Sequence, residues 1–169
     1  MLHDRRRLLD RLDEWSIPFE MHEHPAVFTV DEARVHTAHI PGGHCKNLFL
    51  KDKRDGLWLV TVLDRRRVDL NGLAKRLGAG RFSFGKPPLL ADVLGVTPGA
   101  VTPLAVINDD RHRVRLIVDH GLLAFDRVNC HPLENTATVV LNSADLLRFF
   151  RGTGHEPQVV DFDDGLDLA

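Results

Sequence analysis

The chain has 169 residues, a formal net charge of −2 and 43% hydrophobic residues, which is the composition of a globular protein with its own core. The near balance of charge excludes a protein that coats nucleic acid through charge alone, and two cysteines cannot make a disulfide framework. The charged N-terminus lacks the apolar segment of a signal peptide, and no apolar run is long enough to span a membrane. We therefore expect one domain over residues 1–169, in the cytoplasm and without a membrane partner.

The start of the chain predicts a helix, a strand and a second helix. Apolar side chains at helical spacing predict an amphipathic helix over residues 2–15, and alternation over 17–22 predicts a half-buried strand. The strand residues expected to face the core are Ile17, Phe19 and Met21. A capping box over 29–32 predicts a short helix that begins at Val30 and ends before Pro41.

The middle of the chain predicts a hairpin followed by shorter elements. Residues 45–51 and 57–63 are predicted strands, joined by a turn over 52–56. Because the second strand is almost entirely apolar, we expect it to be buried on both faces. The elements that follow are a helix capped by Asp69 that runs to Leu77 and ends at Gly78, a strand over 82–84, and a helix over 87–94 that ends at Gly95.

The last third of the chain predicts more strands than helices. The expected strands cover residues 104–108, 113–119, 122–127 and 136–141. The first two of these are expected to pair as a hairpin. Ser143 is the expected N-cap of a helix over 144–151, an edge strand follows over 159–162, and the acidic end at 161–169 is expected to be frayed. Interspersed strands and helices with several hairpins predict a mixed-sheet α/β or α+β domain.

Motifs of several enzyme classes are missing from the sequence. The chain has no Gly-x-Ser-x-Gly nucleophile elbow, no GxxxxGK(S/T) phosphate loop, no dinucleotide-binding fingerprint and no His-Glu-x-x-His motif. Histidines close to Cys45 in the sequence have a spacing that matches no zinc motif. They are His22, His24, His36, His39 and His44. Cys45 or Cys130 could act as a nucleophile with a histidine brought in by the fold, although free cysteines more commonly fill core space.

Lys46 and Asn47 stand at the start of the first hairpin strand, where neither residue type favours packing. Lysine is rarely buried without a partner and asparagine is disfavoured in strands, so together they offer a polar substrate a cation and an amide. The alternative is a surface lysine beside a turn asparagine. The loop over 95–99 and His131 also lie at strand ends or turns. Pro98-Gly99 is either a ligand-binding turn with exposed N–H groups or a plain structural turn.

Four segments that span nearly the whole chain carry a family pattern. They cover residues 23–30, 43–52, 95–99 and 129–132. Together they resemble the YbaK/ProX-type aminoacyl-tRNA deacylases, which are related to the editing domain inserted in bacterial prolyl-tRNA synthetases. The Lys-Asn-Leu-Phe-Leu run and the Gly-x-x-Pro-Gly loop are its more specific motifs. The Asn-x-His-Pro element is similar to that of the freestanding ProX/PrdX branch, which removes alanine from mischarged proline tRNA.

The resemblance implies a fold and a site. The implied fold is a central mixed, largely antiparallel sheet surrounded by helices, with the substrate pocket between sheet and helices. The implied catalytic residues are Lys46, Asn47 and His131, and the resemblance implies no metal and no cofactor. The implied substrate-binding residues are Thr29, Gly95, Pro98, Gly99 and Asn129.

The resemblance also implies a reaction, the hydrolysis of the aminoacyl ester in mischarged Ala-tRNA(Pro) by a trans-editing enzyme. In this reaction Lys46 is expected to stabilise negative charge on the carbonyl oxygen or to bind the terminal nucleotide. Asn47 is expected to hold the α-amino group or the attacking water, and His131 to orient water or substrate. Two alternatives stay open: a deacylase for another mischarged tRNA such as Cys-tRNA(Pro), and a non-catalytic module that binds aminoacyl-tRNA ends or a synthetase.

The expected partners are the acceptor end of tRNA(Pro) and prolyl-tRNA synthetase, with no DNA, and we expect a monomer. Two basic clusters are candidate tRNA contacts, the alternative being ordinary solvated charge. They are Lys51, Lys53 and Arg54 in the hairpin turn, and Arg65, Arg66 and Arg67 after the second strand.

Overall fold

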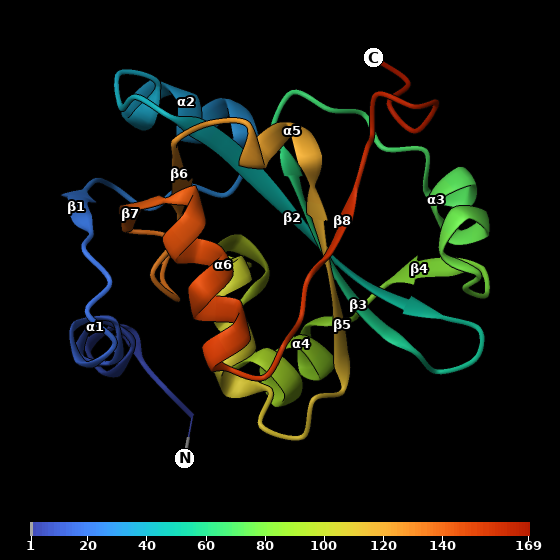
Figure 1. The fold of residues 1–169 in the computed structure, drawn as a ribbon, viewed down its shortest axis with the longest axis horizontal. Helices are drawn as coiled ribbons and strands as arrows, with labels where there is room; N and C mark the ends of the chain where they lie inside the picture. Colours follow the sequence, from blue (N-terminus) through green and yellow to red (C-terminus); the bar gives the residue numbers. More distant parts are fainter. Residues whose placement is uncertain (1) are drawn as a thin grey trace.

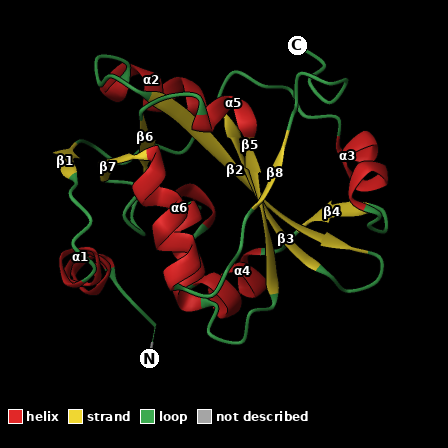
Figure 2. Cartoon of the chain, in the orientation of Figure 1, coloured by secondary structure: helices red, strands yellow, loops and turns green. Residues whose placement is uncertain are grey.

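The computed structural model describes residues 2–169, and in this range helices cover both faces of an eight-stranded mixed sheet (Figure 1, Figure 2). The strands are β1 (Glu20–Glu23), β2 (Gly43–Asp52), β3 (Leu57–Leu63), β4 (Phe82–Phe84), β5 (Val114–Asp119), β6 (Arg127–Cys130), β7 (Ala137–Asn142) and β8 (Gln158–Val160). Their order is β1-β7-β6-β2-β3-β5-β8, and β4 pairs with β2. The β2–β6, β3–β5 and β5–β8 pairs are parallel and the others antiparallel, which confirms the mixed α/β class.

The helices divide between the two faces of the sheet. They are α1 (Arg5–Glu14), α2 (Val30–Thr37), α3 (Leu70–Leu77), α4 (Pro87–Leu94), α5 (His120–Leu123) and α6 (Ser143–Gly152), with 3-10 turns η1 (Pro98–Ala100) and η2 (Pro103–Asn108). Buried residues of α1, α4, α6 and η2 share one core, and those of α3 belong to the other. In the part of the chain that the structure describes, no helix is both long and apolar enough to cross a membrane.

β3 separates these two cores because its side chains alternate between the faces of the sheet. Leu57, Leu59 and Leu63 belong to the core that contains α4 and α6. Trp58, Val60 and Val62 belong to the core that contains α3 and the C-terminal segment. Every residue of β3 is buried, as its apolar sequence predicts.

β2 is the strand at which the sheet opens. It pairs with β6 only at Gly43 and His44, and with β4 only over residues 50–52. Between these two partners, no described strand pairs with residues 45–49 on that edge of β2. The predicted Lys-Asn pair lies in this opening.

The helix caps expected from the sequence are present. The side chain of Thr29 accepts a hydrogen bond from the N–H of Glu32 (3.1 Å) and caps α2. The Glu32 carboxylate accepts from the N–H of Phe28 (2.8 Å), one residue before the donor of a standard capping box. Asp69 caps α3, and Gly78 ends it with a φ of 65°.

Several predictions for the last third are wrong. Residues 103–108 form η2 instead of a strand, since Pro103 stands at its first position and the Thr102 side chain caps it. β5 therefore has no hairpin partner before it and pairs in parallel with β3 and β8. Residues 120–123 form α5, because Asp119 accepts from the N–H of Gly121 (2.8 Å) and begins a helical turn. The strand that follows begins only at Arg127.

Both ends of the chain also differ from expectation. Met21 is 40% exposed instead of facing the core, because β1 is an edge strand that pairs only with β7. Asn142 rather than Ser143 is the N-cap of α6, and it makes no side-chain hydrogen bond there. The acidic C-terminal segment is not frayed, since Phe162 and Leu166 are buried in the core around α3.

Candidate active site

A cavity of about 160 Å³ lies where the sheet opens beside β2. Its walls come from α2 and the loop before it, the start of β2, the turn at η1 and the end of β6. All but one of the predicted catalytic and substrate-binding residues line this cavity. They are Thr29, Lys46, Asn47, Pro98, Gly99, Asn129 and His131.

Gly95 is the exception among these predicted residues. It ends α4 in a left-handed conformation, with a φ of 66°, and does not line the cavity. A Cβ atom at this position would lie 2.8 Å from Nδ2 of Asn108. The glycine therefore allows the chain to leave α4 and reach η1, which does line the cavity.

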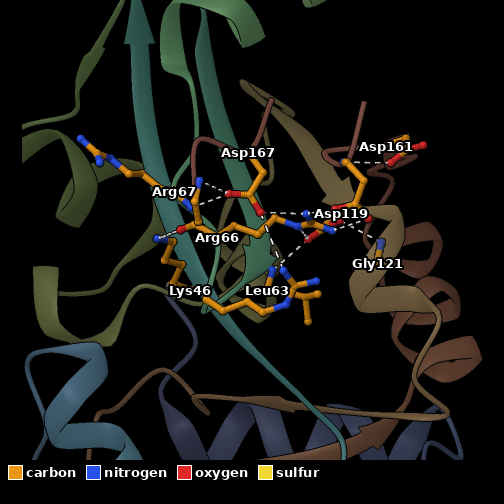
Figure 3. Close-up of polar contacts among 11 residues, drawn as sticks. Lys46, Leu63, Arg66, Arg67, Asp119, Gly121, Asp161 and Asp167 are labelled. Carbon is orange, nitrogen blue, oxygen red and sulfur yellow. Dashed lines mark hydrogen bonds and ion pairs between the residues drawn. The ribbon is translucent and has the colours of Figure 1, made fainter. Parts of the chain in front are cut away.

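Lys46 supplies a half-buried cation at one side of the cavity. Its Nζ donates a hydrogen bond to the main-chain carbonyl of Arg66 (Figure 3). Burial lowers the pKa of Lys46 below its ordinary value of 10.5, and the carboxylates of Asp64 and Asp167 oppose that shift. Asp64 also pairs with Arg34 of α2 at 3.5 Å, so charged groups from two elements surround the ammonium.

Asn47 has both ends of its amide engaged by the protein. Oδ1 accepts from the hydroxyl of Thr61 on β3 (2.6 Å), and Nδ2 donates to the carbonyl of Val101 after η1 (3.2 Å). Adjacent strand residues point to opposite faces, so Asn47 reaches the cavity from the side opposite to Lys46. Sequence reasoning missed Thr61, although a polar residue in an otherwise apolar strand was a signal for it.

His131 is a neutral imidazole with a defined tautomer. Its Nδ1 lies 3.0 Å from the carbonyl oxygen of Ala137, which can only accept, so Nδ1 carries the proton. Burial is the largest cause that lowers the pKa of His131 below 6.5, and nearby His24 adds to the shift. The ring is therefore uncharged at neutral pH, and Nε2 is left as a hydrogen-bond acceptor.

Asn129 presents a second acceptor. Its Nδ2 donates to the carbonyls of Pro41 and Gly43, each at 3.3 Å, which fixes the orientation of the amide. Its Oδ1 is buried and has no hydrogen-bond partner among the described residues. A buried acceptor without a donor costs about 1–3 kcal/mol, so this atom favours a ligand that donates to it.

Comparison with known proteins assigns the chain that forms this cavity to a family. Residues 24–149 match the family model of the aminoacyl-tRNA editing domain. The chain belongs to this family. It is 43% identical over 164 residues to prolyl-tRNA synthetase associated domain-containing protein 1 of Bos taurus, covering 94% of this chain and 95% of that protein. It is 30% identical over 158 residues to the prolyl-tRNA editing protein ProX of Acetoanaerobium sticklandii, covering 93% and 96% of the two chains.

A solved structure has the same fold. It is the crystal structure of a protein proposed as a trans-editing enzyme for prolyl-tRNA synthetase, with a TM-score of 0.73, 22% identity and 100% of each chain covered. The resemblance found in the sequence is thus confirmed as to family and fold. The editing-domain motifs at Lys46-Asn47, 95–99 and 129–132 converge on the opening of the sheet.

The two cysteines of this editing domain lie together beside the cavity. The Cys45 thiol donates to the carbonyl of Asn129 at 3.2 Å, and Cys130 is buried in the larger core. Contact with the Cys45 thiol, and then burial, raise the pKa of Cys130 well above its ordinary value. Since the nucleophile is the thiolate, this environment favours core packing over nucleophilic catalysis by Cys130.

Histidines near the cavity form pairs. His24 stacks on His36, with ring centroids 6.3 Å apart, and its Nε2 lies 2.9 Å from the hydroxyl oxygen of Thr138. His22 and His39 make an edge contact at 6.5 Å. Within residues 2–169, no group of three or more His, Cys, Asp or Glu side chains is arranged to hold a metal ion.

The two basic clusters of the editing domain occupy different surroundings. The first cluster lies at the hairpin end of β2, away from α2 (Figure 1), where Lys51 pairs with Asp55 at 3.2 Å. In the second cluster Arg65 and Arg67 are exposed, whereas Arg66 is only 1% exposed. The prediction that Arg66 contacts tRNA is wrong, because its guanidinium is buried among three carboxylates.

Proposed function

We propose that this editing domain hydrolyses the ester that joins an amino acid to the terminal ribose of a mischarged tRNA, with Ala-tRNA(Pro) as its substrate. The observation that carries the proposal is one cavity lined by a cation, Lys46, and by two residues that each keep an acceptor atom unused by the protein, Asn129 and His131. An aminoacyl ester has the complementary groups, an α-ammonium and a carbonyl oxygen that becomes negative during hydrolysis. Family membership and the likeness to ProX support the substrate class.

Lys46 stabilises the developing oxyanion. An ammonium has three N–H donors, and the Arg66 carbonyl takes one of them. The remaining donors serve the ester carbonyl oxygen, where one well-placed donor is typically worth about 3 kcal/mol of barrier. No covalent nucleophile is required, because water attacks the activated ester directly.

The two acceptors divide the remaining work. Asn129 Oδ1 accepts from the α-ammonium and so holds the aminoacyl group with its ester carbonyl next to Lys46. His131 Nε2 accepts from the attacking water, takes up its proton and returns a proton to the ribose oxygen as the ester bond breaks. Asn47 acts by anchoring the chain after η1 through Val101, rather than by holding the α-amino group.

The proposed amino-acid preference rests on the likeness to the prolyl-tRNA editing protein ProX. In this proposal the pocket accepts the small alanine side chain and rejects the larger proline ring. This is the logic of a second sieve, which removes the small amino acid that a synthetase pocket cannot reject. Cysteine is close to alanine in size, and Cys-tRNA(Pro) is therefore the second candidate substrate.

The proposed setting follows from the proposed substrate. Mischarged tRNA(Pro) is released by prolyl-tRNA synthetase in the cytoplasm, so both the tRNA and the synthetase are the expected partners. The mechanism uses groups of this chain alone, without a metal or cofactor, and one polypeptide carries the complete set. Addition of a chelator is accordingly expected to leave the rate unchanged.

The test of this function is deacylation of Ala-, Cys- and Ser-tRNA(Pro) by the purified protein, with correctly charged Pro-tRNA(Pro) as the control. We expect rapid loss of alanine and intact Pro-tRNA(Pro). Faster loss of cysteine would assign the second candidate substrate. Binding of the tRNAs without hydrolysis of any of them would contradict the enzyme and favour a non-catalytic binding module.

A further inference from the structure

The guanidinium of Arg66 is a fully buried charge held by residues far apart in the chain. Its side chain is 0% exposed, and its nitrogens lie 2.5 Å from Asp119, 2.6 Å from Asp163 and 3.1 Å from Asp167 (Figure 3). Asp119 ends β5, while Asp163 and Asp167 belong to the segment after β8. Because a buried arginine needs paired carboxylates, the C-terminal segment completes the environment of this residue.

The same segment also binds the main chain beside Arg66. The N–H of Arg67 donates to Asp167 Oδ1 at 3.1 Å, and the N–H of Leu168 donates to the carbonyl of Arg67 at 2.7 Å. Val68 and Asp167 form an antiparallel bridge. These contacts fix the peptide units next to Arg66 as well as its side chain.

The main-chain carbonyl of Arg66 is the acceptor for the Lys46 ammonium (Figure 3). That carbonyl belongs to the turn after β3. The C-terminal segment binds this turn through the contacts of Asp167 and Leu168 with Arg67. We propose that the C-terminal segment positions Lys46 for ester hydrolysis, with Asp167 as the positioning residue that acts through Arg66. This inference rests on the proposed function, because it assigns a role to the lysine of the same site.

Asp167 is chosen among the three carboxylates because, unlike Asp119 of β5, it belongs to the C-terminal segment and also contacts the main chain next to Arg66. Its carboxylate accepts from the Arg66 guanidinium and from the Arg67 N–H, so it ties the side chain and the backbone of the turn together. Its side chain is only 10% exposed, whereas that of Asp163 is 66% exposed. Hydrogen bonds from the N–H groups of Ala169 and Arg67 lower the pKa of Asp167, which keeps it ionised.

The C-terminal segment offers a matched control. Asp164 lies in the same segment, is 78% exposed and pairs with Arg76 of α3 at 3.7 Å. It makes no contact with Arg66 among the described residues. Asp164→Ala removes a carboxylate from this segment without touching the route to Lys46.

The experiment combines single-turnover hydrolysis of Ala-tRNA(Pro) with NMR of the lysine ammonium groups, in the parent, Asp167→Ala, Asp167→Asn and Asp164→Ala. The Lys46 signal is assigned by its loss in Lys46→Ala. We expect Asp167→Ala to lower the maximal rate about 10-fold or more at unchanged half-saturating enzyme concentration, and to shift the Lys46 signal. Asp167→Asn, which keeps an acceptor for the Arg67 N–H, should recover part of the rate, and Asp164→Ala should match the parent.

An unchanged Lys46 signal and rate in both Asp167 variants would overturn the proposal, as would an equal loss in Asp164→Ala. If Asp167→Ala does not fold, Asp167→Asn carries the same comparison. If the parent hydrolyses none of the aminoacyl-tRNAs, the proposed function fails. The NMR signals then still decide the role of Asp167: loss of its charge alone would shift the Lys46 signal equally in both Asp167 variants, whereas positioning makes the shift smaller in Asp167→Asn.

Discussion

At the scale of single residues, the active-site chemistry depends on which atoms are already satisfied by the protein. The Ala137 carbonyl fixes the proton of His131 on Nδ1, and two carbonyls fix the Asn129 amide. These contacts leave His131 Nε2 and Asn129 Oδ1 as hydrogen-bond acceptors before any substrate binds. Among the residues that the structure describes, Lys46 donates one hydrogen bond, to the Arg66 carbonyl. The site is therefore preorganised for a group that is cationic at one end and becomes anionic at the other.

The first prediction concerns the pH dependence that His131 imposes. The neutral ring is the active form, so activity is lost when pH falls through its pKa. Because burial lowers that pKa, the acidic decline in the rate of Ala-tRNA(Pro) hydrolysis should lie below pH 6.5. His131→Gln should be slow and should lack this decline. A decline centred above pH 6.5, or one that persists in the variant, would exclude His131 as the titrating group.

The second prediction concerns Thr61, whose hydroxyl satisfies Asn47. Thr61→Val keeps the shape of the side chain but leaves Asn47 Oδ1 without that donor, which should lower the free energy of unfolding by about 1–3 kcal/mol. Urea denaturation measures this change. Thr61→Ser keeps the hydroxyl and serves as the control. Equal stability of the valine variant and the parent would contradict the assigned hydrogen bond.

Residue types and motifs were enough to select Lys46, Asn47 and His131, because charged and amide groups at strand starts have few packing reasons to be there. They could not show that Arg66 is buried, since its partners lie 53 or more positions away in the chain. This error concerns long-range contacts, which no local pattern encodes.

At the scale of elements, the cavity exists because β2 changes neighbours. β6 pairs with its first residues and β4 with its last, and no strand in the described part of the chain pairs with the stretch between them on that edge. The chain after α4 turns back at Gly95 and places η1 against this opening. The terminus of one short helix thus determines where one wall of the cavity lies.

The third prediction compares Gly95 with Gly78, which end α4 and α3 with φ of 66° and 65°. Alanine at either position should cost about 1 kcal/mol of backbone strain. Gly95→Ala should cost more than Gly78→Ala, because its Cβ would meet the Asn108 amide whereas no atom of residues 2–169 lies within 4 Å of a Cβ at Gly78. Thermal or urea unfolding compares the two. An equal loss of stability in the two variants would show that the Asn108 side chain moves away at no cost. That result would contradict the hydrogen bond that holds it to the Leu94 carbonyl.

Local patterns predicted the β2–β3 hairpin, α3 and α4 because turn residues, caps and glycine stops mark these elements directly. They failed for the strands predicted over 104–108 and 122–127, where short apolar runs fit a strand, a helix or a 3-10 turn equally well. The parallel pairing of β5 with β3 and β8 was also hidden, since its partners are distant in sequence.

At the scale of the whole molecule, the C-terminal segment closes the core around α3 and contacts the turn that follows β3. One end of β2, at residues 44–47, lines the cavity, and the other end leads into the hairpin turn. The hairpin end carries exposed Lys53 and Arg54. Its distance from the cavity along β2 suits a contact with the body of a tRNA rather than with its terminal nucleotide.

The fourth prediction tests that contact. The double variant Lys53→Ala/Arg54→Ala should bind tRNA(Pro) more weakly, and the slope of log K against log salt should fall by about 1 for each phosphate that the variant no longer neutralises. The maximal hydrolysis rate should stay unchanged. Arg111→Ala, an exposed arginine in the loop before β5, is the control. An unchanged salt dependence would remove the hairpin turn from the tRNA surface.

The measurement that tests the central claim most directly is single-turnover hydrolysis of Ala-tRNA(Pro) by the parent and by Lys46→Ala. Lys75→Ala, on α3 and away from the cavity, controls for removal of a lysine. We expect Lys46→Ala to remain folded by circular dichroism and to lose about 100-fold or more in rate, while Lys75→Ala keeps the parent rate. Hydrolysis by Lys46→Ala at the parent rate would contradict the assigned mechanism.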